Sequence, residues 1–143
     1  MRSGFTILEV LLSLAIIAIL AAVSVPVLQS FQTRNDLDIA TFAVVQAHRR
    51  AQSLARASEG DTSWGVYATS GSITVFRGAS FVLRATDFDE VFEIPTNMLA
   101  TGTLEVVYAS FSGLANASSS LVLTSIANET RTITLNEKGT VAY

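Results

Sequence analysis

The 143-residue chain contains no cysteine and only one histidine. Without thiols it can form neither a disulfide framework nor a thiolate metal site. Charged side chains make up only 15% of the residues and the net charge is −3, which argues against a surface built to hold a phosphate backbone. Because half of the residues are hydrophobic, the chain is not disordered, and its length suits one compact domain plus an extended helix.

A long apolar run near the N-terminus is the most informative feature that the sequence does contain. The run covers residues 5–28 and would measure roughly 36 Å as a helix, which is enough to cross a bilayer. One carboxylate, Glu9, lies inside it. A charge at the centre of a bilayer costs about 2.5–3.5 kcal/mol on insertion scales and usually marks a functional residue. We therefore expect Glu9 to have a task other than anchoring.

The residues around Glu9 carry a resemblance to a known signal. The hexapeptide is Gly4-Phe5-Thr6-Ile7-Leu8-Glu9, and Pro26 lies near the end of the apolar run. It resembles the class III signal of type IV pilins and type II secretion pseudopilins. The resemblance implies that residues 1–4 are a leader, that a membrane prepilin peptidase cuts after Gly4, and that Phe5 is then methylated. It also implies that Glu9 is an assembly residue and that Pro26 loosens the helix.

The same resemblance implies partners and a location. In the family, the glutamate of an incoming subunit is thought to pair with the terminal amine of a subunit already assembled, and a paired ion in lipid costs less than an isolated one. The expected partners are other pilin or pseudopilin subunits, the prepilin peptidase and an inner-membrane assembly platform. The expected location is the bacterial inner membrane, crossed once, and then an extracellular or periplasmic fibre. We expect no cofactor and no catalytic residues.

Two other interpretations of the apolar run are open. An ordinary secretory signal also has a basic start and an apolar core, and residues 21–24 resemble its cleavage site. Such a core is usually 7–15 residues long and carries no acid, so Glu9 argues against it. A plain single-span anchor is the other alternative, and it gives Glu9 no task.

The amphipathic pattern after Pro26 predicts that one helix extends over residues 5–57, with residues 29–57 as its second part. Apolar residues recur there at spacings of 3 and 4, which places them on one face. That face consists of Leu37, Ala40, Val44, Ala47, Ala51 and Leu54. We expect Arg34, Asp38, Thr41, Arg49, Gln52 and Arg56 away from it. Gly60 is expected to stop the helix.

The remaining residues, 58–143, predict a β-rich globular domain. Short segments rich in aromatic and β-branched residues alternate with turn residues. The expected strands are 64–69, 72–77, 80–85, 91–94, 103–111, 121–126, 130–135 and 140–142. About eight strands behind one helix predict an α+β fold, in which the second half of a long helix packs on a small antiparallel β-sandwich.

This second half also resembles a narrower group, the GspH/FimT minor pseudopilins and minor pilins. The matching segments are Trp64-Gly65-Val66, Ile73-Thr74-Val75-Phe76, Phe111-Ser112-Gly113, Arg131-Thr132-Ile133-Thr134-Leu135 and Gly139-Thr140-Val141. Some members of the group bind DNA during natural transformation through a basic C-terminal segment, and this chain has only Lys138 beside Glu137 there. Nucleic acid is therefore an unlikely partner, and DNA uptake is the second functional hypothesis.

Other chemistry has weaker support. His48, Arg49, Arg50 and Arg56 form a positive cluster in the sequence, and we interpret the arginines as a solvated helix face or as subunit contacts rather than a DNA site. A membrane-anchored enzyme is a distant third hypothesis, because the sequence contains no nucleophile-elbow pattern around a serine. Residues 87–90 could offer oxygen ligands to calcium, but they lack the spacing of a calcium loop, so we expect an exposed acidic turn.

Overall fold

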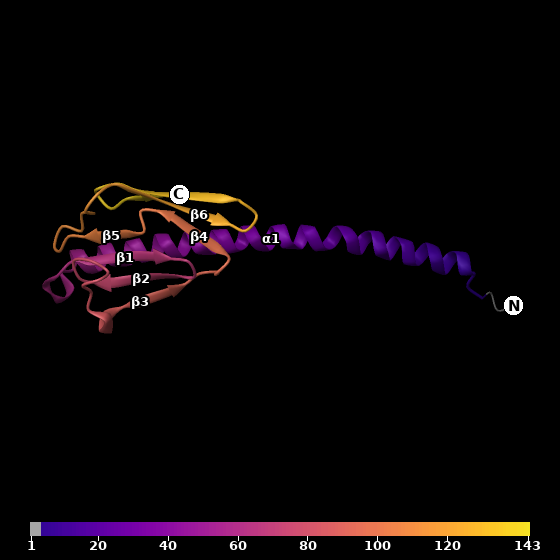
Figure 1. The fold of residues 1–143 in the computed structure, drawn as a ribbon, viewed down its shortest axis with the longest axis horizontal. Helices are drawn as coiled ribbons and strands as arrows, with labels where there is room; N and C mark the ends of the chain where they lie inside the picture. The colour runs from indigo at the N-terminus through magenta and orange to yellow at the C-terminus, as the bar shows by residue number, and fades with distance from the viewer. Residues whose placement is uncertain (1–3) are drawn as a thin grey trace.

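One long helix and two antiparallel sheets make up the protein (Figure 1). The computed structural model describes residues 4–143, without the side chains of Val23, Val25 and Pro26. Helix α1 (Ile7–Arg56) begins far from the sheets, and its second half runs along them. The predicted α+β fold, with a long helix followed by eight strands, is confirmed.

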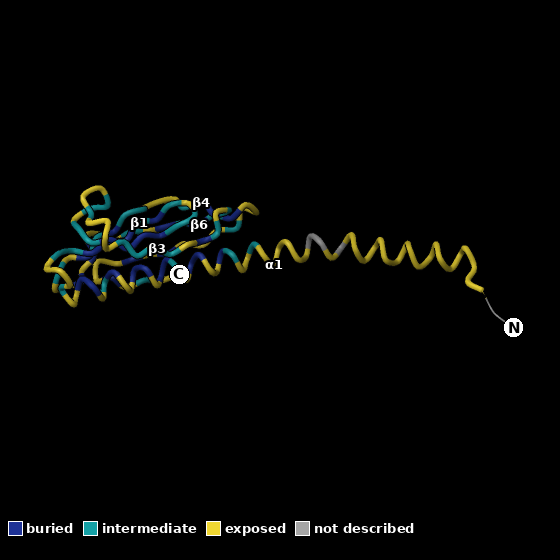
Figure 2. Tube along the Cα trace, turned by 90° about the horizontal axis from the view of Figure 1, so that it is seen from below, coloured by how far each residue is buried: buried dark blue, intermediate teal, exposed yellow. Residues whose placement is uncertain are grey.

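The two halves of α1 have different surroundings (Figure 2). From Ile7 to Phe31 every described side chain is exposed, whereas the second half alternates between buried and exposed residues. All six residues of the predicted apolar face, Leu37, Ala40, Val44, Ala47, Ala51 and Leu54, are buried. Thr41 was expected on the polar side and is instead buried, because its hydroxyl donates to the Leu37 carbonyl at 2.7 Å and thus needs no water.

The helix ends at Arg56, next to the predicted end at residue 57, but the expected glycine does not stop it. Ala57 is its C-terminal cap, and Ser58 takes the left-handed conformation (φ 52°) that ends the helix. The backbone amide of Ser58 donates to the Ala55 carbonyl at 3.1 Å, which satisfies one of the free carbonyls at this end. Gly60 also has a positive φ (71°), but it lies in the short 3₁₀ turn Glu59–Asp61 that follows. The prediction that Gly60 stops the helix was therefore wrong.

The strands form two sheets of four. The first sheet has the order β3-β2-β1-β5 and the second has the order β4-β6-β7-β8, and every neighbouring pair is antiparallel. Their bounds are β1 (Trp64–Thr69), β2 (Ser72–Arg77), β3 (Glu90–Glu93), β4 (Met98–Gly102), β5 (Glu105–Tyr108), β6 (Ser119–Ser125), β7 (Thr130–Leu135) and β8 (Val141–Ala142). The predicted strands 64–69, 72–77 and 130–135 match their observed bounds.

One predicted strand is absent and one observed strand was not predicted, so the total of eight strands is unchanged. Residues 80–85 form a loop, not a strand. The Phe81 ring stacks on Tyr67 with ring centroids 4.0 Å apart, and its backbone amide donates to Glu105 Oε1 at 3.0 Å. These side-chain contacts replace the pairing that a strand would need. The predicted long strand 103–111 is shorter (β5), and β4 lies before it, where no strand was predicted.

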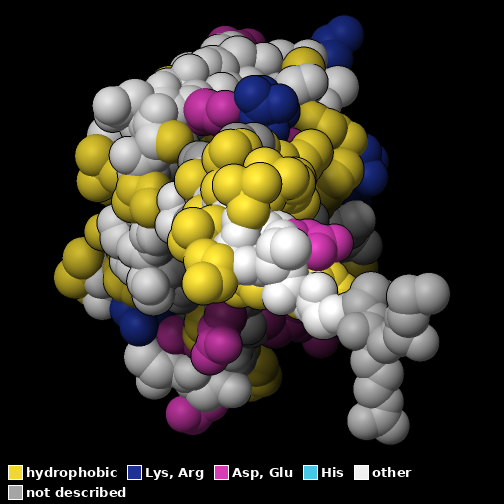
Figure 3. Space-filling model, turned by 90° about the vertical axis from the view of Figure 1, so that its right-hand side faces the viewer, with side chains coloured by type: hydrophobic (Ala, Val, Ile, Leu, Met, Phe, Trp, Pro, Cys, Tyr) yellow, Lys and Arg dark blue, Asp and Glu magenta, His cyan; other side chains and the backbone are white. Residues whose placement is uncertain are grey.

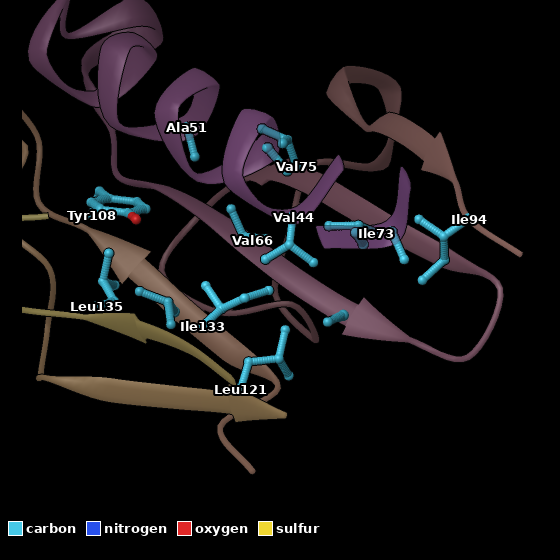
Figure 4. Packing of buried hydrophobic residues seen from close by; sticks show 14 of the residues in the cluster. Val44, Ala51, Val66, Ile73, Val75, Ile94, Tyr108, Leu121, Ile133 and Leu135 are labelled. Carbon is cyan, nitrogen blue, oxygen red and sulfur yellow. The ribbon is translucent and has the colours of Figure 1, made fainter. Parts of the chain in front are cut away.

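The core lies between the second half of α1 and the two sheets (Figure 4). Val44 and Ala51 of the helix face Val66 and Val75 of the first sheet, while the second sheet contributes Leu121, Ile133 and Leu135. Because alanines recur on the buried helix face, the helix axis can approach the sheets closely. This packing fixes the direction in which the first half of α1 leaves the globular part.

Candidate functional site

The segment before α1 is exposed to solvent. Residues 4–6 are not helical, and the Phe5 side chain is 82% exposed. A Cβ built at Gly4 would meet no atom within 4 Å. The bond between Gly4 and Phe5 therefore lies in an open stretch of backbone that an enzyme can reach. The rest of the expected leader, Met1–Ser3, lies outside the described residues.

Thr6 and Glu9 form the start of the helix. Thr6 is the N-cap residue, and its side-chain oxygen accepts from the backbone amide of Glu9 at 3.3 Å. The spacing Thr-x-x-Glu is that of a capping box, in which the acid at the third helical position can reach back to the cap. Sequence reasoning missed Thr6, although this spacing was the signal that could have revealed it. The observed bond uses the backbone amide of Glu9, so the Glu9 carboxylate stays available for the assembly role that the resemblance implies.

The electrostatics of this helix start favour a carboxylate. The N-terminus of a helix carries a partial positive charge, and a nearby acid stabilises it by about 0.3–1 kcal/mol. Cleavage after Gly4 would add an α-amino group at Phe5, one residue before the cap. That amine brings a full positive charge to the positive end of the helix. Glu9 is exposed, so its carboxylate is free to offset this charge or to meet a charge on another molecule.

The apolar run continues from this site along the first half of α1, where the described side chains are mostly hydrophobic and exposed. Seen from the N-terminal end, hydrophobic side chains gather around the helix (Figure 3). The two serines whose side chains interrupt the run are satisfied within the helix, because Ser13 donates to the Glu9 carbonyl and Ser24 to the Leu20 carbonyl, each at 2.7 Å. Among the described residues, α1 is the one helix long and apolar enough to cross a membrane. None of the described residues in its most apolar stretch is buried.

Pro26 lies inside the residue range of α1. Its side chain and surroundings lie outside the described residues, so the loosening of the helix at this position stays a prediction. The assignments of Gly4 and Phe5 to processing and of Glu9 to assembly likewise remain predictions, for which the structure supplies the geometry.

The predicted positive cluster on the second half of α1 is not one surface. His48 is buried, and its Nδ1 lies 2.8 Å from the hydroxyl of Tyr108. Burial lowers the pKa of His48 to about 4, so it is neutral at pH 7. Arg50 binds both carboxylate oxygens of Glu90, with Nη2 2.8 Å from Oε1 and Nε 3.0 Å from Oε2. Only Arg49 and Arg56 of the cluster remain outside these contacts.

The acidic segment 87–90 is tied to arginines. Asp89 Oδ2 accepts from Arg84 Nε at 2.8 Å, and the Arg50 guanidinium holds the pKa of Glu90 below its usual value. The expectation of a simple exposed acidic turn was therefore incomplete. Within residues 4–143 no cluster of three or more His, Asp or Glu side chains could hold a metal ion.

A polar groove lies where α1 leaves the globular part. It is lined by Gln29, Ser30, Gln32, Thr33, Asp36, Asn97, Ile126 and Ala127. The hydroxyls of Ser30 and Thr33 donate to helix carbonyls, at 2.9 and 3.0 Å, and Asp36 accepts from Asn97. Both hydroxyls therefore hydrogen-bond to carbonyls of the helix itself. The groove is thus a surface beside the helix and does not resemble a reaction centre.

Comparison with known proteins identifies the N-terminal segment. Residues 1–25 match the family described as the prokaryotic N-terminal methylation motif. No curated protein and no solved structure matches the chain. The match covers Gly4, Phe5 and Glu9 and most of the apolar run. The chain therefore carries a type IV pilin-like class III signal, which is the mark of a pilin-like precursor anchored in the inner membrane.

Proposed function

We propose that this protein is a pilin-like subunit that is cleaved after Gly4, methylated on Phe5 and polymerised into a type IV pilus or a type II secretion pseudopilus. The observation that carries the proposal is the arrangement at the N-terminus. An exposed, non-helical Gly4–Phe5 bond lies directly before a capped helix whose third residue is Glu9. One short segment thus contains the bond to be cleaved, the Phe5 nitrogen that cleavage would turn into an α-amino group, and the Glu9 carboxylate.

The domain organisation follows from this proposal. Residues 1–4 are the leader, residues 5–28 are first a membrane anchor and then the core of the fibre, and residues 29–57 continue the helix onto the globular domain 58–143. Extraction from lipid would expose the side chains of the first part to water, which is unfavourable in proportion to the apolar area. Helices of neighbouring subunits can cover that area again, so polymerisation is the stable state outside the membrane.

Within the superfamily, we place the protein in the GspH/FimT group of minor pseudopilins and minor pilins. Its support is the fold after α1, in which Trp64-Gly65-Val66 opens β1 and the turn at Gly139 joins β7 to β8. In this group, subunits are thought to lie at or near the fibre tip or in its body. The abundance of the chain in isolated fibres distinguishes these two positions.

The test must separate two roles of Glu9, because the carboxylate can cap its own helix or pair with another subunit. Glu9→Ala removes both abilities. Glu9→Gln keeps a side chain that suits a capping box but removes the charge. Thr6→Ala is the matched control, since it removes the observed cap and leaves the carboxylate in place.

We expect both Glu9 variants to be inserted and cleaved but depleted from fibres, and Thr6→Ala to assemble nearly normally. The measurement is the ratio of the chain in sheared fibres to the chain in membranes. If Glu9→Gln assembles like the wild type while Glu9→Ala does not, capping explains the residue and the pairing role is wrong. Normal fibre levels for both Glu9 variants would contradict either role in assembly.

A further inference from the structure

The polar groove beside α1 is a cavity of about 630 Å³. Helix residues between Gln29 and Asp36 form one wall, and Asn97, Ile126 and Ala127 form the other. Asn97 precedes β4, and Ile126 and Ala127 lie in the turn between β6 and β7. Both segments lie at the end of the globular part from which the first half of α1 extends (Figure 1). The groove is therefore at the end of the domain nearest to the apolar run.

In the membrane-anchored state, this groove lies at the level of the lipid headgroups. The apolar run ends at residue 28, and Gln29 and Thr33 follow about 1.5 and 7.5 Å further along the helix axis. The headgroup layer on each side of a bilayer is about 5–8 Å thick. Asp36 lies about 12 Å beyond residue 28, but helical side chains lean toward the N-terminus, which brings its carboxylate back toward this layer. A headgroup of the surrounding lipid can therefore reach the groove.

The fixed polar groups of the groove are mostly hydrogen-bond acceptors. The hydroxyls of Ser30 and Thr33 donate to helix carbonyls, so only the lone pairs of their oxygens remain free. The Asp36 carboxylate accepts from Asn97 Nδ2 at 3.2 Å and has no ion-pair partner among the described residues. The groove thus offers a negative charge and free oxygen lone pairs.

Asn97 adds an acceptor without a donor. Its Oδ1 is buried and has no hydrogen-bond partner in the described part of the chain, which is unfavourable for a polar atom. Because Nδ2 of the same amide donates to Asp36, the unpartnered oxygen lies next to the Asp36 carboxylate. Turning the amide over would lose that bond. A cation that carries several N–H donors is the ligand that suits both oxygens at once.

We propose that the groove binds the ethanolamine headgroup of a phospholipid, with the ammonium at Asp36 and Asn97 Oδ1. The phosphate then lies toward the amides of Gln29 and Gln32, which are exposed and can donate to it. Gln32 is about 6 Å nearer to the apolar run than Asp36. This order matches the headgroup, whose phosphate is nearer to the acyl chains than its amine. The inference rests on the membrane-anchored state in the proposed function and adds a ligand to it.

Other headgroups fit the groove less well. The ammonium of a choline headgroup carries methyl groups in place of N–H donors, so it cannot hydrogen-bond to Asn97 Oδ1. A glycerol headgroup leaves the phosphate charge without a cation and so brings a net negative charge toward Asp36. Arg34, the first base after the apolar run, is already paired with Glu129 at 3.1 Å. The groove should therefore prefer ethanolamine over both choline and glycerol.

The first experiment measures which lipids the full chain retains. The chain is purified in a non-ionic detergent and mixed with equal amounts of phosphatidylethanolamine, phosphatidylcholine and phosphatidylglycerol, all with the same acyl chains. Native mass spectrometry then counts the lipids that stay bound. Equal acyl chains cancel the contribution of the apolar helix. We expect about tenfold more phosphatidylethanolamine than either other lipid, because only its amine makes charge-assisted hydrogen bonds.

Two matched variants assign this preference to the groove. Asp36→Asn removes the charge but keeps an oxygen that can accept from Asn97. Asp38→Asn removes the same charge from the same helix outside the groove, where Asp38 accepts from Arg131 at 3.3 Å. We expect Asp36→Asn to lose the tenfold preference, and Asp38→Asn to keep it.

Three results would overturn the inference. Equal retention of the three lipids by the wild type would mean that the groove does not recognise the amine. A preference for phosphatidylglycerol would mean that the phosphate alone is bound, and an unchanged preference in Asp36→Asn would place the lipid elsewhere. In all three the proposed function stands if the processed chain is found in fibres. An ethanolamine preference in a chain that never enters fibres would instead overturn the proposed function.

A second experiment tests the level of the groove in the membrane. The photoreactive residue p-benzoylphenylalanine replaces Ile126, which is 74% exposed, or Leu83, which is 78% exposed. Leu83 lies in the loop between β2 and β3, at the opposite end of the globular part (Figure 1). After irradiation of native membranes, we expect a phospholipid adduct at position 126 and none at position 83. No adduct at position 126, or equal adducts at both positions, would contradict the placement of the groove among the headgroups.

Discussion

The buried His48–Tyr108 pair allows a quantitative prediction about stability and pH. His48 is 6% exposed and Tyr108 is fully buried, and burial lowers the pKa of His48 from 6.5 to about 4. Between these two values the unfolded chain binds a proton that the folded chain does not. The stability due to a neutral His48 is therefore complete above pH 6.5 and is lost progressively as the pH falls toward 4.

The size of the effect follows from the shift. Over the whole window it amounts to about 3 kcal/mol, and about 2 kcal/mol is already lost at pH 5. His48→Gln provides the comparison, because glutamine can still hydrogen-bond to the Tyr108 hydroxyl and does not titrate. The wild type should lose about 2 kcal/mol more than His48→Gln between pH 7.5 and pH 5.

The assay is urea unfolding of the full chain in detergent micelles, followed by tryptophan fluorescence. Trp64 is the only tryptophan and is 3% exposed, so its emission reports the opening of the core. The carboxylates titrate in both proteins, and the difference between the two therefore isolates His48. Parallel pH dependences would refute the reasoning, because they would mean that the imidazole is charged or solvated in the folded protein.

Three further substitutions test the processing site and the core. Gly4→Leu should block cleavage and leave an uncut chain in the membrane, as judged by the mass of the protein. Gly65→Ala should destabilise the fold by about 1–3 kcal/mol in the same urea assay, since a Cβ at this position would overlap the fully buried Phe76 ring. Tyr108→Phe should cost about 1–3 kcal/mol at pH 7.5, because it leaves the buried Nδ1 of His48 without its partner.

The buried face of α1 could be predicted well because spacing along a helix directly reports which side each residue faces. Leu37, Ala40 and Val44 were identified in this way. Thr41 was not, and neither was the burial of Val45, because two sheets enclose a wider arc of the helix than a single apolar stripe indicates. How far a partner wraps around a helix depends on tertiary structure, which local spacing does not contain.

The strand errors have a different physical cause. Residues 80–85 contain Phe, Val and Leu and have the composition of a strand, yet Phe81 lies between Tyr67 and Arg84, whose guanidinium is 3.8 Å from the ring centroid. The contact with Tyr67 joins residues from different strands and loops of the chain. Strand β4 pairs with β6, from Met98 opposite Ser125 to Gly102 opposite Leu121, across the intervening β5, so local composition gave little sign of it. The β propensity of a residue depends on the cross-strand neighbours against which it packs, and local sequence does not show which residues these are.

The candidate site also contains some features that the sequence could predict and others that required the structure. Gly4, Phe5 and Glu9 could be predicted from sequence because they belong to a short linear motif. The cap formed by Thr6 could have been predicted from its spacing to Glu9, since both partners lie in one helical turn. The exposure of Phe31, Ile39 and Phe42 was missed because it becomes apparent only when the sheets are known to cover the other face of the helix.

The most direct test of the central claim is mass spectrometry of the N-terminus of this chain in fibres sheared from the native cell. The proposal predicts a mature chain that begins with methylated Phe5 and has lost residues 1–4. A chain that still carries Met1, a chain cut near residue 22 as in ordinary secretion, or fibres without the chain would contradict the claim that this protein is a processed fibre subunit.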